Sequence, residues 1–264
     1  MVIIGEKINS SNKKVASALG KKDMEFIQKL AKEQVEAGAD YIDVNAGMFG
    51  DQEAELLAWL VKTVQAVVRT PCCLDSPNPD AIKEALEVHQ GRAMVNSITS
   101  EKERYQKLVP LVKHYQAKVI ALCLGEKGIP ETVDERFLSA KRIIDDLLKE
   151  GFHLPDIYVD PLIQPIAINS SAAIIALELI ERVMKCYLGI HTVCGISNIS
   201  YGLPLRRMLN VSFLIMARAK GLDTAILDPC DHLVLSAVLA SEALAGKDAH
   251  GLKYISAFRK GRIK

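Results

Sequence analysis

The chain of 264 residues has no strong excess of charge of either sign. Lysine and arginine total 33 and aspartate and glutamate total 32, so the formal net charge is +1, and aromatic residues make up 5% of the chain. A nucleic-acid binder neutralises phosphates with a basic face and often stacks bases on aromatic rings. The composition therefore argues against a nucleic-acid partner. The one basic cluster, Phe258–Arg262, is expected to be a solvated segment or a contact for an acidic partner.

Long apolar runs are also missing. No stretch reaches the roughly 20 residues that cross a bilayer. The first residues enter the apolar run Val2–Ile4 without the charged region and signal-length apolar stretch of a secretory leader. We therefore expect no membrane association and a cytoplasmic location.

Cysteine occurs six times, but no two cysteines form a C-x-x-C pair. Zinc sites of the structural kind need closely spaced ligands, which this spacing does not supply. A disulfide framework is typical of small secreted chains with little core, whereas 49% of this chain is apolar. We expect reduced, buried thiols that pack as small hydrophobic groups.

Eight short apolar runs alternate with longer segments of helical periodicity. The runs are continuous rather than alternating, which is typical of parallel strands buried on both faces. They are Val2–Gly5, Tyr41–Val44, Cys72–Leu74, Ala93–Val95, Lys118–Leu124, Ile157–Val159, Thr192–Ile196 and Thr224–Leu227. The count of eight, the length, and the absence of a G-x-G-x-x-G motif after the first run favour a closed barrel over an open dinucleotide-binding sheet. We predict a single (β/α)8 TIM barrel over residues 1–264.

Polar residues follow nearly every predicted strand. They are Glu6, Asn9, Asp43, Asn45, Asp75, Asn96, Asp160, Ser197, Asn198 and Asp228. The carboxyl ends of the strands build the catalytic face of such a barrel. Any single aspartate there is as readily a helix cap, and Asp228 fits that reading, but the repetition over seven strands favours a common binding face.

The residue types at this face narrow the chemistry. No histidine follows a strand, as a barrel metal hydrolase would need, and Lys118 begins its strand at the opposite end, where a Schiff-base aldolase could not use it. No nucleophile elbow is present. Carboxylates accept paired hydrogen bonds, and amides both donate and accept. The face therefore suits a neutral, planar heterocycle with several N–H donors.

The order of the motifs resembles the methyltetrahydrofolate:corrinoid methyltransferase family, which includes the folate domain of cobalamin-dependent methionine synthase. The resemblance covers nearly the whole chain. Its motifs are Ile4–Asn9, Tyr41–Asn45, Leu74–Ser76, Met94–Ser97, Tyr158–Leu162, Gly195–Ser200, Arg206 with Asn210, and Gly221–Ile226. It implies a pterin-binding barrel whose substrate is tetrahydrofolate or 5-methyltetrahydrofolate.

The resemblance also implies a role for each site residue. Asp75, Asn96 and Asp160 would hydrogen-bond the pterin edge, and Asn198 would face N5 of the pterin. The two aspartates would order the water that exchanges a proton with N5, so that Asn198, Asp160 and Asp75 form the catalytic set.

Five further residues would support this set, according to the same resemblance. Arg206 would reach the folate, and Gly195 and Ser197 would add backbone or hydroxyl contacts. Asp43 and Asn45 would orient the side chains that hold the pterin.

The corrinoid is expected to come from a separate protein. The cobalamin-binding pattern D-x-H-x-x-G is missing, because Asp248-Ala249-His250 is not followed by glycine at the required place. Clustered cysteine and histidine, which would bind zinc and activate a thiol acceptor, are also missing. The resemblance further implies a homodimer.

Two other readings stay open. Dihydropteroate synthase shares the pterin barrel, but it needs a basic pyrophosphate site, for which Arg206 and Arg207 are the candidates. A folate-binding subunit without catalysis is the second alternative. The motifs do not give the direction of methyl transfer.

Overall fold

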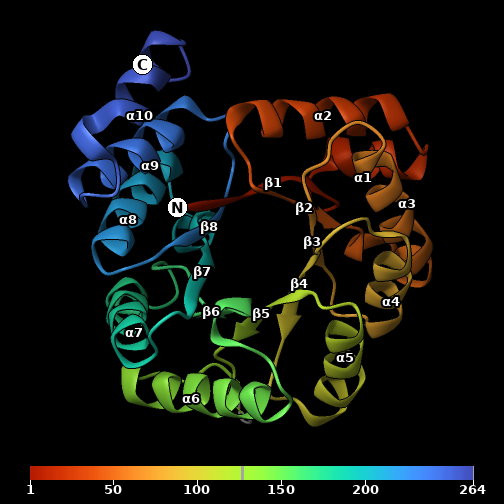
Figure 1. The fold of residues 1–264 in the computed structure, drawn as a ribbon, viewed down its shortest axis with the longest axis horizontal. Helices are drawn as coiled ribbons and strands as arrows, with labels where there is room; N and C mark the ends of the chain where they lie inside the picture. Colours follow the sequence, from red (N-terminus) through yellow and green to blue (C-terminus); the bar gives the residue numbers. More distant parts are fainter. Residues whose placement is uncertain (126–127, 264) are drawn as a thin grey trace.

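The computed structural model describes residues 1–125 and 128–263, and in it eight parallel strands pair in chain order to close a barrel (Figure 1). The strands are β1 Val2–Asn9, β2 Tyr41–Asn45, β3 Cys72–Asp75, β4 Met94–Ile98, β5 Lys118–Leu122, β6 Ile157–Asp160, β7 His191–Gly195 and β8 Thr224–Leu227. Helices surround the barrel. The predicted (β/α)8 barrel is therefore confirmed.

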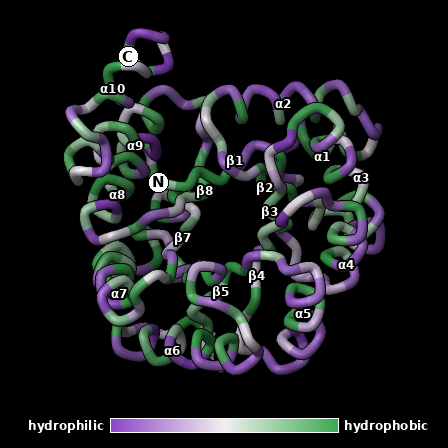
Figure 2. Tube along the Cα trace, in the orientation of Figure 1, coloured by the Kyte–Doolittle hydropathy of each residue, from purple (hydrophilic) through white to green (hydrophobic). Residues whose placement is uncertain are grey.

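The helices of the outer ring follow the strands, as the alternation of apolar runs and periodic segments predicted. They are α2 Met24–Ala37, α3 Glu53–Gln65, α4 Pro79–Val88, α5 Lys102–His114, α6 Val133–Lys149, α7 Ala172–Cys186, α8 Arg206–Ala219 and α9 His232–Leu244. Each turns its apolar stripe to the sheet. In Figure 2 the strands are mostly hydrophobic and the outward faces of the helices are hydrophilic.

The core has two layers, one between sheet and helices and one inside the barrel. The inner layer is a cluster of buried side chains from alternate strand positions: Ile4, Tyr41, Cys73, Met94, Ile120, Tyr158 and Val193. At the amino-terminal end of the barrel, Nζ of Lys118 donates to the Tyr158 hydroxyl at 2.8 Å. The filled lower part of the barrel leaves its carboxyl-terminal end as the place for a ligand.

Two short helices were not predicted from the sequence. Helix α1, Lys13–Gly20, follows β1, and α10, Leu252–Arg259, follows α9. Both have eight residues, too few for a clear periodic pattern. Both carboxylate oxygens of Asp248 accept backbone N–H bonds at the start of α10, which gives this residue of the D-x-H sequence a structural role.

The basic segment Phe258–Arg262 is mostly solvated, as expected, and only its last residue and the following Ile263 are packed. The Arg262 guanidinium donates to the carbonyl of Ala37, at the end of α2. Ile263 is buried. Apolar contact and a backbone hydrogen bond thus hold the end of the segment against the barrel.

The cysteine prediction was correct for four of the six residues and wrong for Cys186, while Cys230 is half-buried. Cys72, Cys73, Cys123 and Cys194 are free and buried, whereas Cys186 is exposed.

In the part of the chain that the structure describes, no helix has the length and hydropathy needed to span a membrane.

Strand β1 brings Glu6 to the barrel mouth through a close contact with α2. A Cβ atom at Gly5 would lie 2.4 Å from Oε1 of Gln34, so no larger residue fits there without a shift. The same Gln34 oxygen accepts the N–H of Lys7 at 3.0 Å. The strand register shifts between Gly5 and Ile8. Gly5 and Gln34 therefore fix the backbone on both sides of Glu6.

Candidate functional site

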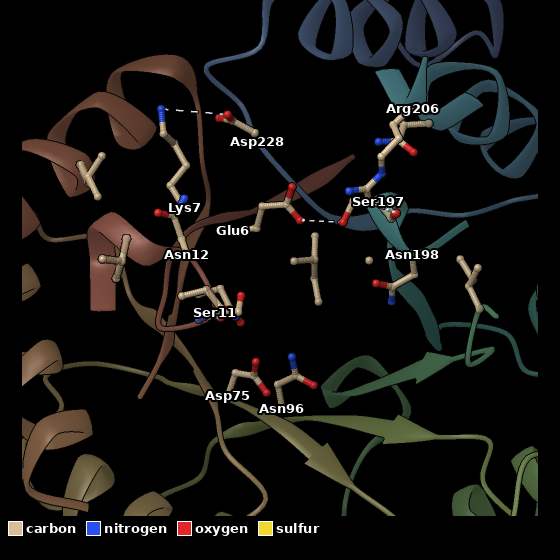
Figure 3. Close-up of a pocket in the computed structure, with 18 of the residues that line it drawn as sticks. Glu6, Lys7, Ser11, Asn12, Asp75, Asn96, Ser197, Asn198, Arg206 and Asp228 are labelled. Carbon is tan, nitrogen blue, oxygen red and sulfur yellow. Dashed lines mark hydrogen bonds and ion pairs between the residues drawn. The ribbon is translucent and has the colours of Figure 1, made fainter. Parts of the chain in front are cut away.

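A cavity of about 1050 Å³ opens at the carboxyl ends of the strands (Figure 3). All predicted site residues line it except Asn45, which lies behind Asp75. The predicted site residues that line the cavity are Asp43, Asp75, Asn96, Asp160, Gly195, Ser197, Asn198 and Arg206. Figure 3 shows Asp75 and Asn96 together on one side and Ser197, Asn198 and Arg206 on the opposite side.

Asp75 and Asn96 are held as neighbours by the pairing of β3 with β4, in which their Cα atoms are partners. Asn45 donates from Nδ2 to Oδ2 of Asp75 at 3.0 Å, and its own Oδ1 accepts the Ser10 hydroxyl at 2.7 Å. This chain of bonds fixes which oxygen of Asp75 remains available to a ligand.

Burial disfavours the ionised form of the two carboxyl groups in this part of the cavity wall, those of Asp75 and Asp43. Burial raises the pKa of Asp75 to about 6, against the opposing effect of the hydrogen bond from Asn45. Burial and the nearby Asp75 raise the pKa of Asp43 well above its usual range. Oδ1 of Asp43 is buried without a hydrogen-bond partner among the described residues. A buried polar atom of this kind is stabilised when a ligand supplies the missing bond.

Asp160 ends β6 on the next part of the wall. Its Oδ1 accepts the N–H of Leu162 at 2.7 Å, and burial raises its pKa to about 7. Leu162 has a φ of 59°, which leucine rarely adopts. Both residues line the cavity.

The buried Arg136 of α6 holds this unusual turn in place. Its guanidinium donates to the carbonyls of Pro161 and Leu162 at 2.8 and 2.9 Å and to the carbonyl of Pro130 at 2.8 Å. The turn in turn directs the Leu162 N–H at Asp160. Arg136 therefore supports the cavity wall through this turn. Nothing in its local sequence distinguishes it from an exposed, charged residue on a helix surface.

We expect Arg136→Met to destabilise the protein by about 3 kcal/mol, because it leaves buried carbonyls without donors. It should also weaken ligand binding at Asp160, since the Leu162 turn loses its support. Urea unfolding and a binding titration would measure the two effects. Lys141→Met, at an exposed position of the same helix, is the comparison variant. Equal stability of the two variants would contradict this role.

Asn198 lies in a 3-10 turn, Ile196–Ser200, that follows β7. A Cβ atom at Gly195 would lie 3.1 Å from Nδ2 of Asn198, so the glycine leaves room for this side chain. Arg206 donates from Nη2 to the carbonyl of Ser197 at 2.8 Å and from Nε to the hydroxyl of Ser200 at 3.1 Å. The turn that carries Asn198 is thus fixed from the start of α8.

Two acidic residues of the mouth, Glu6 and Asp228, were not among the predicted site residues. Burial and the nearby Asp228 raise the pKa of Glu6 to about 7. The cap of α9 is Asp231, whose carboxylate accepts from the N–H of Leu233 at 2.9 Å, so the reading of Asp228 as a helix cap was wrong. Asp228 lies 4.0 Å from Nζ of Lys7 and faces the cavity.

The carboxylates and amides of the cavity suit hydrogen bonding to a ligand. Among residues 1–125 and 128–263, no three histidine, cysteine, aspartate or glutamate side chains are grouped as metal ligands. Apolar side chains, among them Leu122 and Ile226, line the cavity between the polar groups. Apolar walls with a few placed carboxylates and amides are typical of a pocket for a flat, polar ring.

The fold and the cavity together define a (β/α)8 barrel with a hydrogen-bonding pocket at the carboxyl ends of its strands. The chain belongs to the pterin binding enzyme family, whose model matches residues 5–228. The family resemblance predicted from the motifs is thereby confirmed.

Two curated relatives and one solved structure show how far the similarity extends. The chain is 35% identical over its whole length to a methylcorrinoid:tetrahydrofolate methyltransferase of Eubacterium limosum, of which 98% is covered. A methionine synthase of Mycobacterium leprae is 28% identical over 94% of this chain, which spans 22% of that protein. Dihydropteroate synthase of Clostridium difficile, solved with pteroic acid, has a TM-score of 0.73, 18% identity and coverage of 92% and 96% of the two chains, and thus shares the fold.

Proposed function

We propose that this protein is a methyltransferase that moves a methyl group between N5 of tetrahydrofolate and the cobalt of a corrinoid carried on a separate protein. The observation that carries the proposal is the full-length similarity to the Eubacterium limosum enzyme, together with a cavity whose carboxylates and amides match a pterin. The name of that relative supports methylcorrinoid as the donor and tetrahydrofolate as the acceptor.

The pterin fits the wall formed by Asp75, Asn96 and Asp160. The amino-pyrimidinone edge of a pterin presents N–H donors, which carboxylate oxygens accept in pairs, and the amide of Asn96 both donates and accepts. Asn45 would keep Asp75 oriented, and Asp43, with its unpartnered oxygen, would support the same wall.

Asn198 would face N5 from the opposite side of the cavity. Nitrogen N5 gains positive charge as its lone pair bonds the methyl carbon. The carbonyl oxygen of Asn198 can accept a hydrogen bond from N5–H, and that bond strengthens as the charge develops. An amide does not titrate in this range, so Asn198 would stabilise the charge without removing the proton. In this arrangement Gly195 leaves space for Asn198, and Ser197 and Arg206 position its turn.

The corrinoid partner would dock over the cavity mouth. As a further part of the proposal, we infer a homodimer in the cytoplasm. The family resemblance supports the dimer, and the six free thiols suit a reducing compartment. Sedimentation analysis of the purified protein would test the dimer directly.

The function is tested by mixing the protein with methylcob(III)alamin, bound to a carrier protein or free, and tetrahydrofolate. We expect absorbance changes that report loss of the methyl–cobalt bond, and an equal amount of 5-methyltetrahydrofolate. Mixing the protein with cob(I)alamin and 5-methyltetrahydrofolate should give the reverse reaction, with methylcob(III)alamin and tetrahydrofolate as products. Binding of tetrahydrofolate without turnover in either direction would favour a non-catalytic folate-binding subunit instead.

Dihydropteroate synthase activity is tested in parallel. The protein would be incubated with hydroxymethylpterin pyrophosphate and p-aminobenzoate, and dihydropteroate would be measured. We expect none, because the full-length relative at 35% identity is a methyltransferase, whereas the similarity to dihydropteroate synthase is one of fold. Formation of dihydropteroate would contradict the proposal.

A further inference from the structure

Glu6 occupies a part of the cavity that the proposed pterin clamp leaves unused. In Figure 3 it lies beside Ser197, across the cavity from Asp75 and Asn96, and it points toward Ser197. The Ser197 hydroxyl donates to Oε2 of Glu6 at 3.5 Å. Asn198, the next residue along the turn, lines the same cavity as Glu6.

The groups around Glu6 favour exchange of its proton near neutral pH. Burial and the charge of Asp228, which follows β8, raise its pKa to about 7, while the Ser197 hydroxyl and the Arg206 guanidinium oppose the rise. Asp43 of β2 faces the same space, and Glu6 raises its pKa in turn. A carboxyl group in this range gives and takes a proton with comparable ease.

The proposed reaction requires such a group. When N5 of tetrahydrofolate receives a methyl group, it must also lose its proton, and in the opposite direction it must regain one. Asn198 cannot carry that proton. Asp160 is bonded to the Leu162 N–H, and Asp75 to Asn45, and both would be bonded to the pterin edge.

We propose that Glu6 is the proton-exchanging residue for N5, set opposite the pterin-holding wall and beside the turn of Asn198. This inference rests on the proposed function. In the direction of tetrahydrofolate methylation, the N5 lone pair forms the N–C bond, and the electron pair of the carbon–cobalt bond stays on the metal. The N5–H bond then breaks, its electrons remain on N5, and the proton bonds a carboxylate oxygen of Glu6. The carboxyl group afterwards releases this proton to water.

The two directions should depend on pH in opposite ways. Methylation of tetrahydrofolate uses the ionised form of Glu6, so its rate should rise with pH through about 7. Demethylation of 5-methyltetrahydrofolate uses the protonated form, so its rate should fall with pH through the same range. Glu6→Gln should lower kcat about a hundredfold in both directions. It should also remove the Glu6 ionisation from both profiles and leave those of Asp160 and Asp75, while the dissociation constant of tetrahydrofolate stays within a few-fold of the wild-type value.

Neighbouring carboxylates supply the comparison variants. Asp228→Asn removes the negative charge that raises the Glu6 pKa, so the midpoint of both profiles should move to lower pH. Glu33→Gln changes a carboxylate of α2 that contacts Lys7 but does not line the cavity, so it should leave the midpoint in place. Glu6→Asp should keep a pH-dependent rate, lower than that of the wild type.

The outcomes separate this inference from the proposed function. If the wild-type protein transfers no methyl group, the proposed function fails. If the wild-type protein is active and Glu6→Gln keeps the wild-type profiles, Glu6 does not exchange the proton. Should Glu6→Gln not fold, as judged by circular dichroism, an unmoved midpoint in Asp228→Asn would overturn the assignment equally.

Discussion

Replacement of Asn198 by alanine is expected to lower kcat for methyl transfer by about a hundredfold, with little change in the affinity for tetrahydrofolate. The loss corresponds to about 3 kcal/mol, the usual effect of removing one hydrogen bond that forms mainly in the transition state. Affinity is retained because the residues proposed to hold the pterin edge, Asp75, Asn96 and Asp160, are unchanged, and Figure 3 shows Asp75 and Asn96 across the cavity from Asn198.

The measurement needs binding and turnover on the same preparation. A fluorescence titration would give the dissociation constant of tetrahydrofolate, and the corrinoid absorbance would give kcat in both directions. Asn198→Asp is the matched variant, because it keeps an acceptor oxygen at the same place and should retain more of the turnover. A parallel loss of affinity and turnover in Asn198→Ala would mean that this residue binds substrate and transition state equally.

Gly195 offers an independent route to the same conclusion. Its missing Cβ leaves the space that Nδ2 of Asn198 occupies, at 3.1 Å from where a Cβ atom would lie. Turnover in Gly195→Ala should therefore fall with the displacement of Asn198. Both residues belong to one short stretch of sequence, which is why the motif was visible without a structure.

Local sequence patterns were sufficient to predict the barrel and one half of the site. Each strand is a continuous apolar run, and a polar residue after such a run can be placed at the cavity mouth without knowledge of its neighbours. Asp75 and Asp160 were located in this way. Asn198 lies in the turn beyond β7 rather than at the end of a strand. The same pattern, a polar residue after an apolar run, still predicted its place at the cavity.

The residues that were missed depend on contacts between distant segments. The environment of Glu6 comes from Ser197 and Asp228, which lie far along the chain and reach Glu6 only because β8 pairs with β1 to close the barrel. Arg136 has the sequence context of a solvated helix, and its burial against Pro161 and Leu162 follows from the packing of α6 on the β6 loop. No local periodicity contains this information.

Replacement of Asp160 by asparagine is expected to abolish useful pterin binding and, at pH 8, to stabilise the protein. The pterin edge presents N–H donors to this oxygen pair, and an amide offers a donor of its own where an acceptor is needed. Loss of a buried, charged partner of this kind costs about 4 kcal/mol, which weakens affinity about a thousandfold. An isothermal titration with tetrahydrofolate would measure the loss.

The stability effect follows from the raised pKa of Asp160. Burial raises the pKa of this carboxyl group to about 7 in the folded protein, from an ordinary value of 3.8. Between about pH 4 and pH 7 the folded chain therefore binds more protons than the unfolded chain, so the free energy of unfolding falls as the pH rises. The slope for one such group is about 1.4 kcal/mol per pH unit. Asp75 and Glu6 contribute with the same sign.

The amide side chain of the Asp160→Asn variant would carry no charge at any of these pH values, while its Oδ1 can still accept the Leu162 N–H. Urea unfolding at pH 5 and pH 8 should therefore show a smaller decrease for Asp160→Asn than for the wild type, and a higher stability of the variant at pH 8. A variant less stable than the wild type at pH 8 would contradict the account. The confirmed result would mean that the protein retains an ionisable carboxyl group in its barrel at the expense of its own stability, because the ligand supplies the hydrogen-bond donors that the folded chain lacks.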